Sequence, residues 1–165
     1  MRVLGIDPGL TATGFGVIEC EGDCHRSLAY GCLRPSPRRP LSERLLLLLN
    51  DLSEVITRFR PDEVAIEQPF MANNVRSALA LGQARAAALL AAARAALRVY
   101  EYPPATVKQS VAGYGRGDKA QVKEMVRLQL GLLEPPEPDD ASDALAVALC
   151  HVYQSRAARM MEAQA

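Results

Sequence analysis

The sequence predicts an α/β domain built on a mixed five-stranded sheet with flanking helices. The chain has 165 residues, of which 49% are hydrophobic, enough for one domain with its own core. The first 33 residues have the pattern of three short strands joined by turns. The remainder alternates strand-like with helix-like segments, an order typical of helices packed on a sheet. We therefore expect residues 1–165 to form a single domain.

The first three strands are predicted from short apolar or alternating segments. Arg2–Asp7 is an apolar run that ends in Asp-Pro-Gly, the signature of a buried strand stopping at a turn. Residues 13–19 alternate, and Cys24–Leu33 follows after a short turn. Short turns favour an antiparallel arrangement of these three strands. Residues 34–40 contain three prolines and are predicted to be a stiff surface linker.

The helices and the two remaining strands follow from periodicity. Residues 41–60 place leucines and other apolar residues at helical spacing and stop before Pro61. Residues 77–96 are predicted to be a helix with small apolar residues on every side, which we expect to be covered on more than one face. The other predicted elements are strands Glu63–Glu67 and Arg98–Tyr102 and helices 119–130 and 141–160.

Composition excludes several classes of protein. No uncharged apolar run reaches the roughly 18 residues that a membrane span needs, and no secretory signal is recognisable, so we expect a cytoplasmic protein without a membrane partner. The four cysteines lack the paired spacing of a structural zinc site, and we expect reduced, mostly buried thiols. His151 lies eight residues beyond Asp143, roughly 12 Å along a helix, too far to join a metal site there.

The formal net charge of zero conceals an uneven distribution. Nineteen basic residues balance nineteen acidic ones overall. Residues 71–131, however, carry a net charge of +6, and residues 132–143 hold five acids and no base. A basic region beside an acidic site suits a polyanionic substrate such as a nucleic acid.

Four acidic residues are candidates for one catalytic site. Asp7 and Glu67 end two predicted strands, and Asp140 and Asp143 share one face at the start of the last helix. Singly, such residues often serve as turn or helix-cap residues. Together they predict a site for Mg2+ or Mn2+, with two ions per active site in which phosphodiester hydrolysis would occur. Asp139 adjoins Asp140, and we choose Asp140 for its spacing to Asp143.

Five further residues are candidates for nucleic-acid contacts. Phe70 follows Glu67 by three residues and would stack on or wedge between bases, although a lone aromatic residue equally suits the core. The basic candidates are ordinary solvated charges in the alternative interpretation; they are Arg76, Lys108, Arg116 and Lys119.

Five motifs occur in order and together resemble the RuvC family of bacterial Holliday junction resolvases. They are Gly5-Ile6-Asp7-Pro8-Gly9 with Thr13-Gly14, Ala65-Ile66-Glu67-Gln68 with Phe70-Met71-Ala72-Asn73, Ser77-Ala78-Leu79-Ala80-Leu81-Gly82-Gln83-Ala84-Arg85, Val107-Lys108-Gln109, and Asp140-Ala141-Ser142-Asp143-Ala144-Leu145-Ala146.

The resemblance implies a ribonuclease H-like fold and Mg2+-dependent nicking of two symmetry-related strands of a four-way DNA junction, in recombination and DNA repair. It also implies a homodimer, cooperation with the RuvA-RuvB branch-migration complex and preference for a short T-containing sequence. By the same resemblance, Asp7, Glu67, Asp140 and Asp143 are the catalytic and metal-binding residues. Phe70 would enter the junction, and two lysines, Lys108 and Lys119, would lie near the scissile phosphate.

Three alternative functions fit parts of the sequence. The turn at Asp7 is similar to the phosphate-binding turn of sugar kinases and actin-like ATPases, which need two such domains. A ribonuclease H-like nuclease acting on structured RNA would begin with a similar turn. A non-catalytic junction-binding module would not need all four acids. For the resolvase, a dimer would supply the second cover for helix 77–96.

Overall fold

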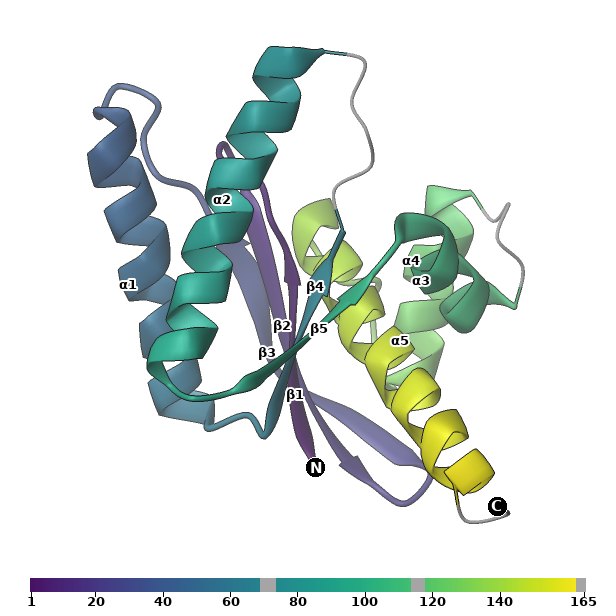
Figure 1. Cartoon of the computed structure of the whole chain (residues 1–165). Coiled ribbons are helices and arrows are strands. Elements are labelled where there is room, and N and C mark those ends of the chain that lie inside the picture. Colours follow the sequence, from purple (N-terminus) through teal and green to yellow (C-terminus); the bar gives the residue numbers. More distant parts are fainter. Residues whose placement is uncertain (69–73, 114–117, 163–165) are drawn as a thin grey trace.

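The computed structural model describes residues 1–68, 74–113 and 118–162, and its centre is a mixed five-stranded sheet (Figure 1). The strand order is β3-β2-β1-β4-β5. Strands β1, β2 and β3 pair antiparallel, and β4 and β5 run parallel to β1, which confirms the predicted antiparallel opening and the mixed sheet. The strands span Arg2–Asp7 (β1), Thr13–Glu21 (β2), Cys24–Leu33 (β3), Glu63–Glu67 (β4) and Arg98–Tyr102 (β5).

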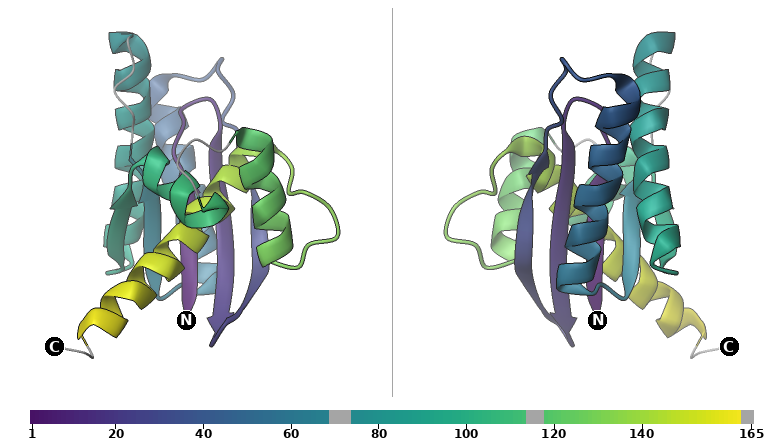
Figure 2. Two further views of the ribbon diagram at one scale, coloured as in Figure 1. Left: turned by 90° about the vertical axis from the view of Figure 1, so that its right-hand side faces the viewer. Right: turned by 90° about the vertical axis from the view of Figure 1, so that its left-hand side faces the viewer.

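Helices cover both faces of the sheet (Figures 1 and 2). Helices α1 and α2 lie on one face, and α5 crosses the opposite face, contacting β1 and β2 most extensively. Helices α3 and α4 pack on α5 rather than on the sheet. The helices span Leu41–Phe59 (α1), Val75–Arg94 (α2), Pro104–Ala112 (α3), Lys119–Gln129 (α4) and Asp139–Glu162 (α5).

The main difference from the predicted elements is helix α3, which the sequence reasoning missed. The pair Pro103-Pro104 is typical of a loop, but a proline at the first helical position has no N–H to lose and fits a helix start. Helix α5 begins at Asp139, two residues earlier than predicted, so Asp139 and Asp140 lie in its first turn. All four cysteines are free thiols, but only Cys20 and Cys150 are buried. Across the described ranges, no helix is long and apolar enough to cross a bilayer.

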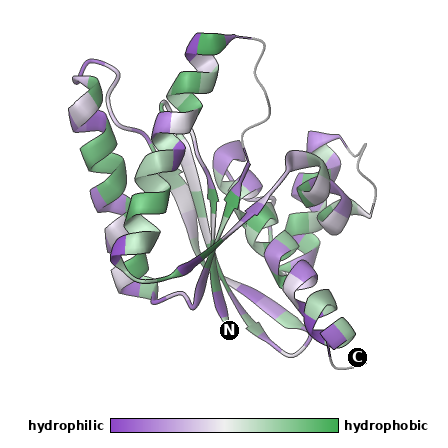
Figure 3. Ribbon diagram, in the orientation of Figure 1, coloured by the Kyte–Doolittle hydropathy of each residue, from purple (hydrophilic) through white to green (hydrophobic). Residues whose placement is uncertain are grey.

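The pleat of β1 and β4 decides which face each acidic residue occupies. Leu4 and Ile6 belong to the core beneath α1 and α2, whereas Val3 belongs to the core beneath α5. Side chains alternate along a strand, so Asp7 points to the face of α5. The same alternation places Glu67 on that face, and the first turn of α5 above it is hydrophilic (Figure 3).

Glycines let α5 lie unusually close to the sheet. A Cβ at Gly5 would lie 2.1 Å from the carbonyl oxygen of Ala144, and one at Gly14 would lie 1.8 Å from that of Asp140. Neither position has room for any side chain. Gly14 pairs with Asp7 across β1 and β2, so this contact brings the first turn of α5 over the end of β1. The close approach therefore sets the height of Asp140 and Asp143 above Asp7.

Replacing Gly14 by alanine is expected to lift the start of α5 from the sheet. The new methyl group collides with helix backbone, and overpacking of this kind costs about 1–3 kcal/mol. Urea titration should show a loss of about 2 kcal/mol for Gly14→Ala. The matched control is Gly82→Ala in α2, where a Cβ meets nothing within 4 Å and helix propensity favours alanine. If Gly14→Ala lost no more free energy of unfolding than Gly82→Ala, the result would contradict the close packing of α5 on Gly14.

Candidate active site

Asp7 and Glu67 form a hydrogen-bonded carboxyl pair at the ends of adjacent strands. Residues of β1 and β4 pair in register up to Ile6 and Ile66, so the next residues, Asp7 and Glu67, are neighbours. Burial, followed by the charges of Glu67, Asp143 and Asp140, raises the pKa of Asp7 to about 8. Asp7 therefore keeps its proton at neutral pH and donates it to the Glu67 carboxylate.

The pKa of Glu67 is raised as well. Burial is the largest cause, and the charge of Asp143 adds to it. The hydrogen bond from Asp7 and the positive charges of Lys108 and Lys119 act in the opposite direction and offset only part of the rise. Lys108 and Lys119 therefore compensate only part of the negative charge at the end of β4.

Asp143 approaches the pair from the first turns of α5 and is held by α4. The Lys119 ammonium donates a hydrogen bond to Oδ2 of Asp143 over 2.9 Å. Burial nevertheless raises the pKa of Asp143, with the lysine opposing that rise. The Lys119 pKa is raised in return, because its hydrogen bond to Asp143 favours the charged ammonium.

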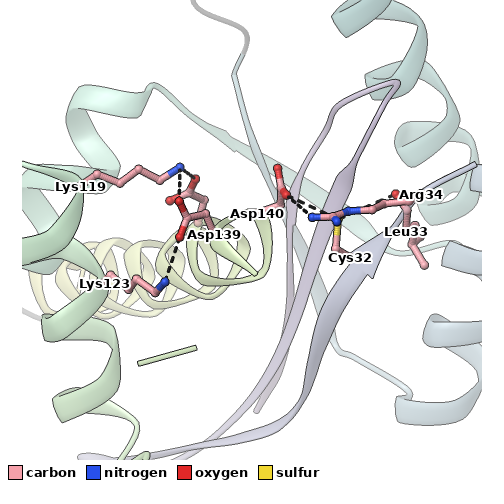
Figure 4. A network of polar contacts seen from close by, with 8 residues as sticks. Cys32, Leu33, Arg34, Lys119, Lys123, Asp139 and Asp140 are labelled. Carbon is pink, nitrogen blue, oxygen red and sulfur yellow. Dashed lines mark hydrogen bonds and ion pairs between the residues drawn. The ribbon is translucent and has the colours of Figure 1, made fainter. Parts of the chain in front are cut away.

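Asp140 belongs to the same first turns but points in another direction. Figure 4 shows its carboxylate facing Cys32 and Arg34, while Asp139 faces Lys119 and Lys123 of α4. The Lys123 ammonium donates to Asp139 over 2.9 Å. Asp140, and not Asp139, is among the carboxylates whose charges raise the pKa of Asp7. The choice of Asp140 over its neighbour as a metal ligand stays a prediction.

The four carboxylates have different partners in the folded protein. Within residues 1–68, 74–113 and 118–162, no three histidine, cysteine, aspartate or glutamate side chains form a ready-made metal-binding group. Asp7 and Glu67 share a proton, Asp143 binds a lysine, and Asp140 faces an arginine. Three kinds of positive partner thus compensate the negative charge of the cluster.

A pocket opens beside this cluster. It has a volume of about 210 Å³ and contains two of the predicted basic residues, Lys108 and Lys119, together with Glu67 and Asp143. Lys108 lies on α3, the helix that was not predicted, and Lys119 begins α4. The pocket combines carboxylate oxygens with two ammonium groups, an arrangement suited to a phosphate group accompanied by cations.

The remaining predicted contacts are dispersed. Arg76 is exposed in the first turn of α2. Phe70 and Arg116 lie outside the described residues. Part of the positive charge of segment 71–131 is paired within the protein, because among the described residues Arg85 binds Glu101 and Lys123 binds Glu137 and Asp139.

His151 is a buried structural residue rather than part of the carboxylate cluster. Its Nε2 lies 2.7 Å from Oε2 of Glu63, and its Nδ1 lies 2.7 Å from the Tyr102 hydroxyl. Both partners belong to the sheet, at β4 and β5, so the ring fastens the middle of α5 to these strands. Both ring nitrogens of His151 are therefore engaged by residues outside the carboxylate cluster.

Sequence reasoning missed Cys32 and Arg34, which contact Asp140. The linker prediction treated Arg34 as a surface residue, and the cysteines were assigned to packing. The register of the sheet explains their position: Cys32 pairs with Gly14, which pairs with Asp7. The antiparallel pairing predicted for the first three strands could have been followed from Asp7 to Gly14 and then to Cys32. It would have placed Cys32 at the same end of the sheet as the acidic cluster.

Comparison with solved structures defines the class of the fold. The yeast mitochondrial Holliday junction resolvase Ydc2 matches with a TM-score of 0.62 at 14% identity, covering 90% of this chain and 77% of the other. At this identity the likeness shows the fold alone. This likeness and the mixed sheet with flanking helices define a ribonuclease H-like fold, which confirms the predicted fold class.

Closer similarities identify the family. The sequence model of "Crossover junction endodeoxyribonuclease RuvC" matches residues 3–151. The RuvC of Chloroflexus aggregans is 54% identical over 153 residues, 93% of each chain. The structure of T. thermophilus RuvC in complex with Holliday junction substrate matches with a TM-score of 0.92 and 41% identity, covering 96% of each chain. The chain belongs to the RuvC family of endodeoxyribonucleases, as the motifs predicted.

The raised pKa of Asp7 predicts how the stability of the metal-free protein depends on pH. The folded state holds a proton that the unfolded state releases above its ordinary pKa of 3.8. The folded state therefore binds more protons between pH 3.8 and about 8, and the free energy of unfolding falls as pH rises through this range. Asp7→Asn removes the titrating group, so the decline should become shallower and stability at pH 8 should increase.

Thermal unfolding in EDTA at several pH values between 4 and 9 measures this effect. A gain of about 1 kcal/mol would raise Tm by about 2–4 °C for a chain of this size. Asp139→Asn is the matched control, because a lysine lowers the pKa of that exposed carboxylate and its removal should lower stability slightly. An unchanged pH profile in Asp7→Asn would show that Asp7 is ionised in the folded protein.

Proposed function

We propose that this chain resolves four-way DNA junctions by nicking two symmetry-related strands with divalent metal ions. The observation that carries the proposal is the partly buried cluster of Asp7, Glu67 and Asp143, beside a pocket with two lysines, in a member of the RuvC family. The T. thermophilus relative, similar over 96% of each chain, is described in complex with a Holliday junction substrate. These points favour junction DNA over structured RNA and over a non-catalytic binding module.

The donor set fits a hard divalent cation. Asp7, Glu67, Asp140 and Asp143 offer carboxylate oxygens, the ligands that Mg2+ and Mn2+ prefer. The raised pKa values of Asp7, Glu67 and Asp143 indicate negative charge that the folded protein leaves undercompensated. We assign these four residues to hold two Mg2+ ions, with Mn2+ as a substitute. When bound, the ions would activate water and stabilise the leaving oxygen of a phosphodiester.

The lysines of the pocket complement that chemistry. Lys108 and Lys119 border the pocket together with Glu67 and Asp143, so their ammonium groups would attract the phosphate to be cut. Lys119 already binds Asp143 and is 57% exposed, which leaves it able to exchange the carboxylate for a phosphate. We assign further DNA contacts to Arg76 and Arg116, and we assign Phe70 to stacking on bases of the junction.

Two cleavage sites require two copies of the chain. We propose a homodimer through α1 and α2, where Leu46, Leu79 and Leu90 are each more than half exposed. Ala86 and Ala87 line an apolar hollow between these helices, which a twin surface would fill. Cooperation with the RuvA-RuvB branch-migration complex in the cytoplasm completes the proposed role, which residues 1–165 would perform as a single domain.

Cleavage assays with three substrates test the activity. The protein should introduce paired nicks in a mobile four-way junction with Mg2+, none in EDTA, and far fewer in a plain duplex or an RNA hairpin. Asp7→Asn should bind the junction but cut at least about 100-fold more slowly, because the amide keeps the shape and loses the charge.

Two neighbouring substitutions sharpen the assay. Asp140→Asn should lose cleavage, whereas Asp139→Asn should retain it, because Asp139 faces Lys119 and Lys123 on the other side of the helix (Figure 4). Equal cutting of all three substrates would refute the junction preference. Full cleavage by Asp7→Asn would remove this residue from the mechanism.

Sedimentation tests the dimer. The natural sequence should sediment at twice the 17.9 kDa of one chain at micromolar concentration, and Leu90→Glu should shift it toward the monomer by burying a charge at the interface. Leu128→Glu is the matched control, since Leu128 is similarly exposed but lies on α4, away from the proposed interface. A monomeric natural sequence, or equal dissociation by both variants, would contradict this interface.

A further inference from the structure

Arg34 and Cys32 both contact the Asp140 carboxylate. Oδ2 of Asp140 lies 3.4 Å from Nη2 of Arg34 and 3.6 Å from Sγ of Cys32. The arginine Nε also donates to the same sulfur over 3.4 Å. Figure 4 shows these three side chains meeting at the end of β3, on the side of Asp140 opposite α4. The thiol thus helps to fix the guanidinium against the carboxylate.

The contact has a direct effect on the acidic cluster. Asp140 is the member of the four whose carboxylate faces a cation from the β2–β3 side, while Asp143 faces α4. Among the described residues the acids do not converge into a metal-binding group. An ion that takes Oδ2 of Asp140 must displace the Arg34 guanidinium, which faces the same oxygen.

The Arg34 guanidinium is well placed for such an exchange. Its side chain is 59% exposed, so the ion pair with Asp140 is weak and solvent can reach the group. Arg34 also begins the linker 34–40, which carries two more arginines, Arg38 and Arg39. A guanidinium binds phosphate through two parallel hydrogen bonds, a stronger partner than the single long contact to Asp140.

We propose that Arg34 is a positioning residue that couples DNA binding to metal binding: a backbone phosphate takes the guanidinium, and Asp140 is released to complete the ligand set. The inference rests on the proposed function, in which Asp140 is a metal ligand. Coupling between two ligands is reciprocal, so metal and DNA each favour the binding of the other. Without DNA, Arg34 competes with the metal ion for Asp140. The affinity of the site for the metal ion is therefore lower in the DNA-free protein.

Substitution of Arg34 should therefore act in opposite directions on the two ligands. In Arg34→Gln, Mn2+ should bind the DNA-free protein about threefold more tightly, the scale of one exposed ion pair, as measured by electron paramagnetic resonance of free Mn2+. The same variant should bind a four-way junction in EDTA about threefold more weakly by fluorescence anisotropy, because a phosphate contact is lost. Arg34→Lys keeps the charge but loses the paired hydrogen bonds of the guanidinium, so both effects should have the same signs as in Arg34→Gln and be smaller.

Arg38→Gln is the matched control, because it removes the same charge from the same linker. Arg38 itself contacts no carboxylate within the described residues. This variant should weaken junction binding and leave Mn2+ affinity unchanged.

An equal rise in Mn2+ affinity in Arg34→Gln and Arg38→Gln would reduce the effect to general electrostatics and overturn the coupling. Equal Mn2+ affinity in Arg34→Gln and the natural sequence would overturn it too, with the metal site intact. No Mn2+ binding to the natural sequence would overturn the metal site itself.

Discussion

The contact between α5 and the sheet is the constraint on which the site depends. Two glycines, Gly5 and Gly14, let helix backbone lie where any side chain would collide. The first turn of α5 consequently stands directly over the end of β1, and a helix set one side chain higher would leave Asp140 and Asp143 remote from Asp7. Burial then follows from the same contact, and burial is the largest cause of the raised pKa of Asp7. Packing and electrostatics thus share one origin.

The positions of the four acids could be predicted from the sequence because they depend on local rules. Asp7 and Glu67 end strands whose apolar pattern is plain, and the spacing of Asp140 and Asp143 needs only helix geometry. The order of the elements also followed from periodicity and turns. Helix α3 was missed because Pro103 and Pro104 are as typical of a loop as of a helix start, and tertiary packing on α5 decides between them.

The direction of each acidic side chain was not predictable in the same way. Asp140 and Asp143 are three residues apart, yet one faces Arg34 and the other faces Lys119. Arg34 lies 106 residues from Asp140 in the sequence, and Lys119 belongs to a different helix, α4. Local spacing fixes which acids share a helix face, whereas the cation that each one meets depends on how β3 and α4 pack around that face. The zero net charge hid this arrangement, because basic residues of the middle segment bind acids individually.

The negative charge of the cluster is partly compensated in three chemically different ways, which respond to two different conditions. A proton compensates Asp7, an ammonium compensates Asp143, and a guanidinium compensates Asp140. The proton leaves as pH rises, whereas both cations can be drawn away by phosphate and are weakened by salt. In the proposed mechanism, a polyanionic backbone would do more than dock beside the acids: by occupying Lys119 and Arg34 it would remove two counter-charges from the site. The negative charge thereby exposed is what a divalent cation would balance, so the substrate itself would raise the affinity of the site for its metal.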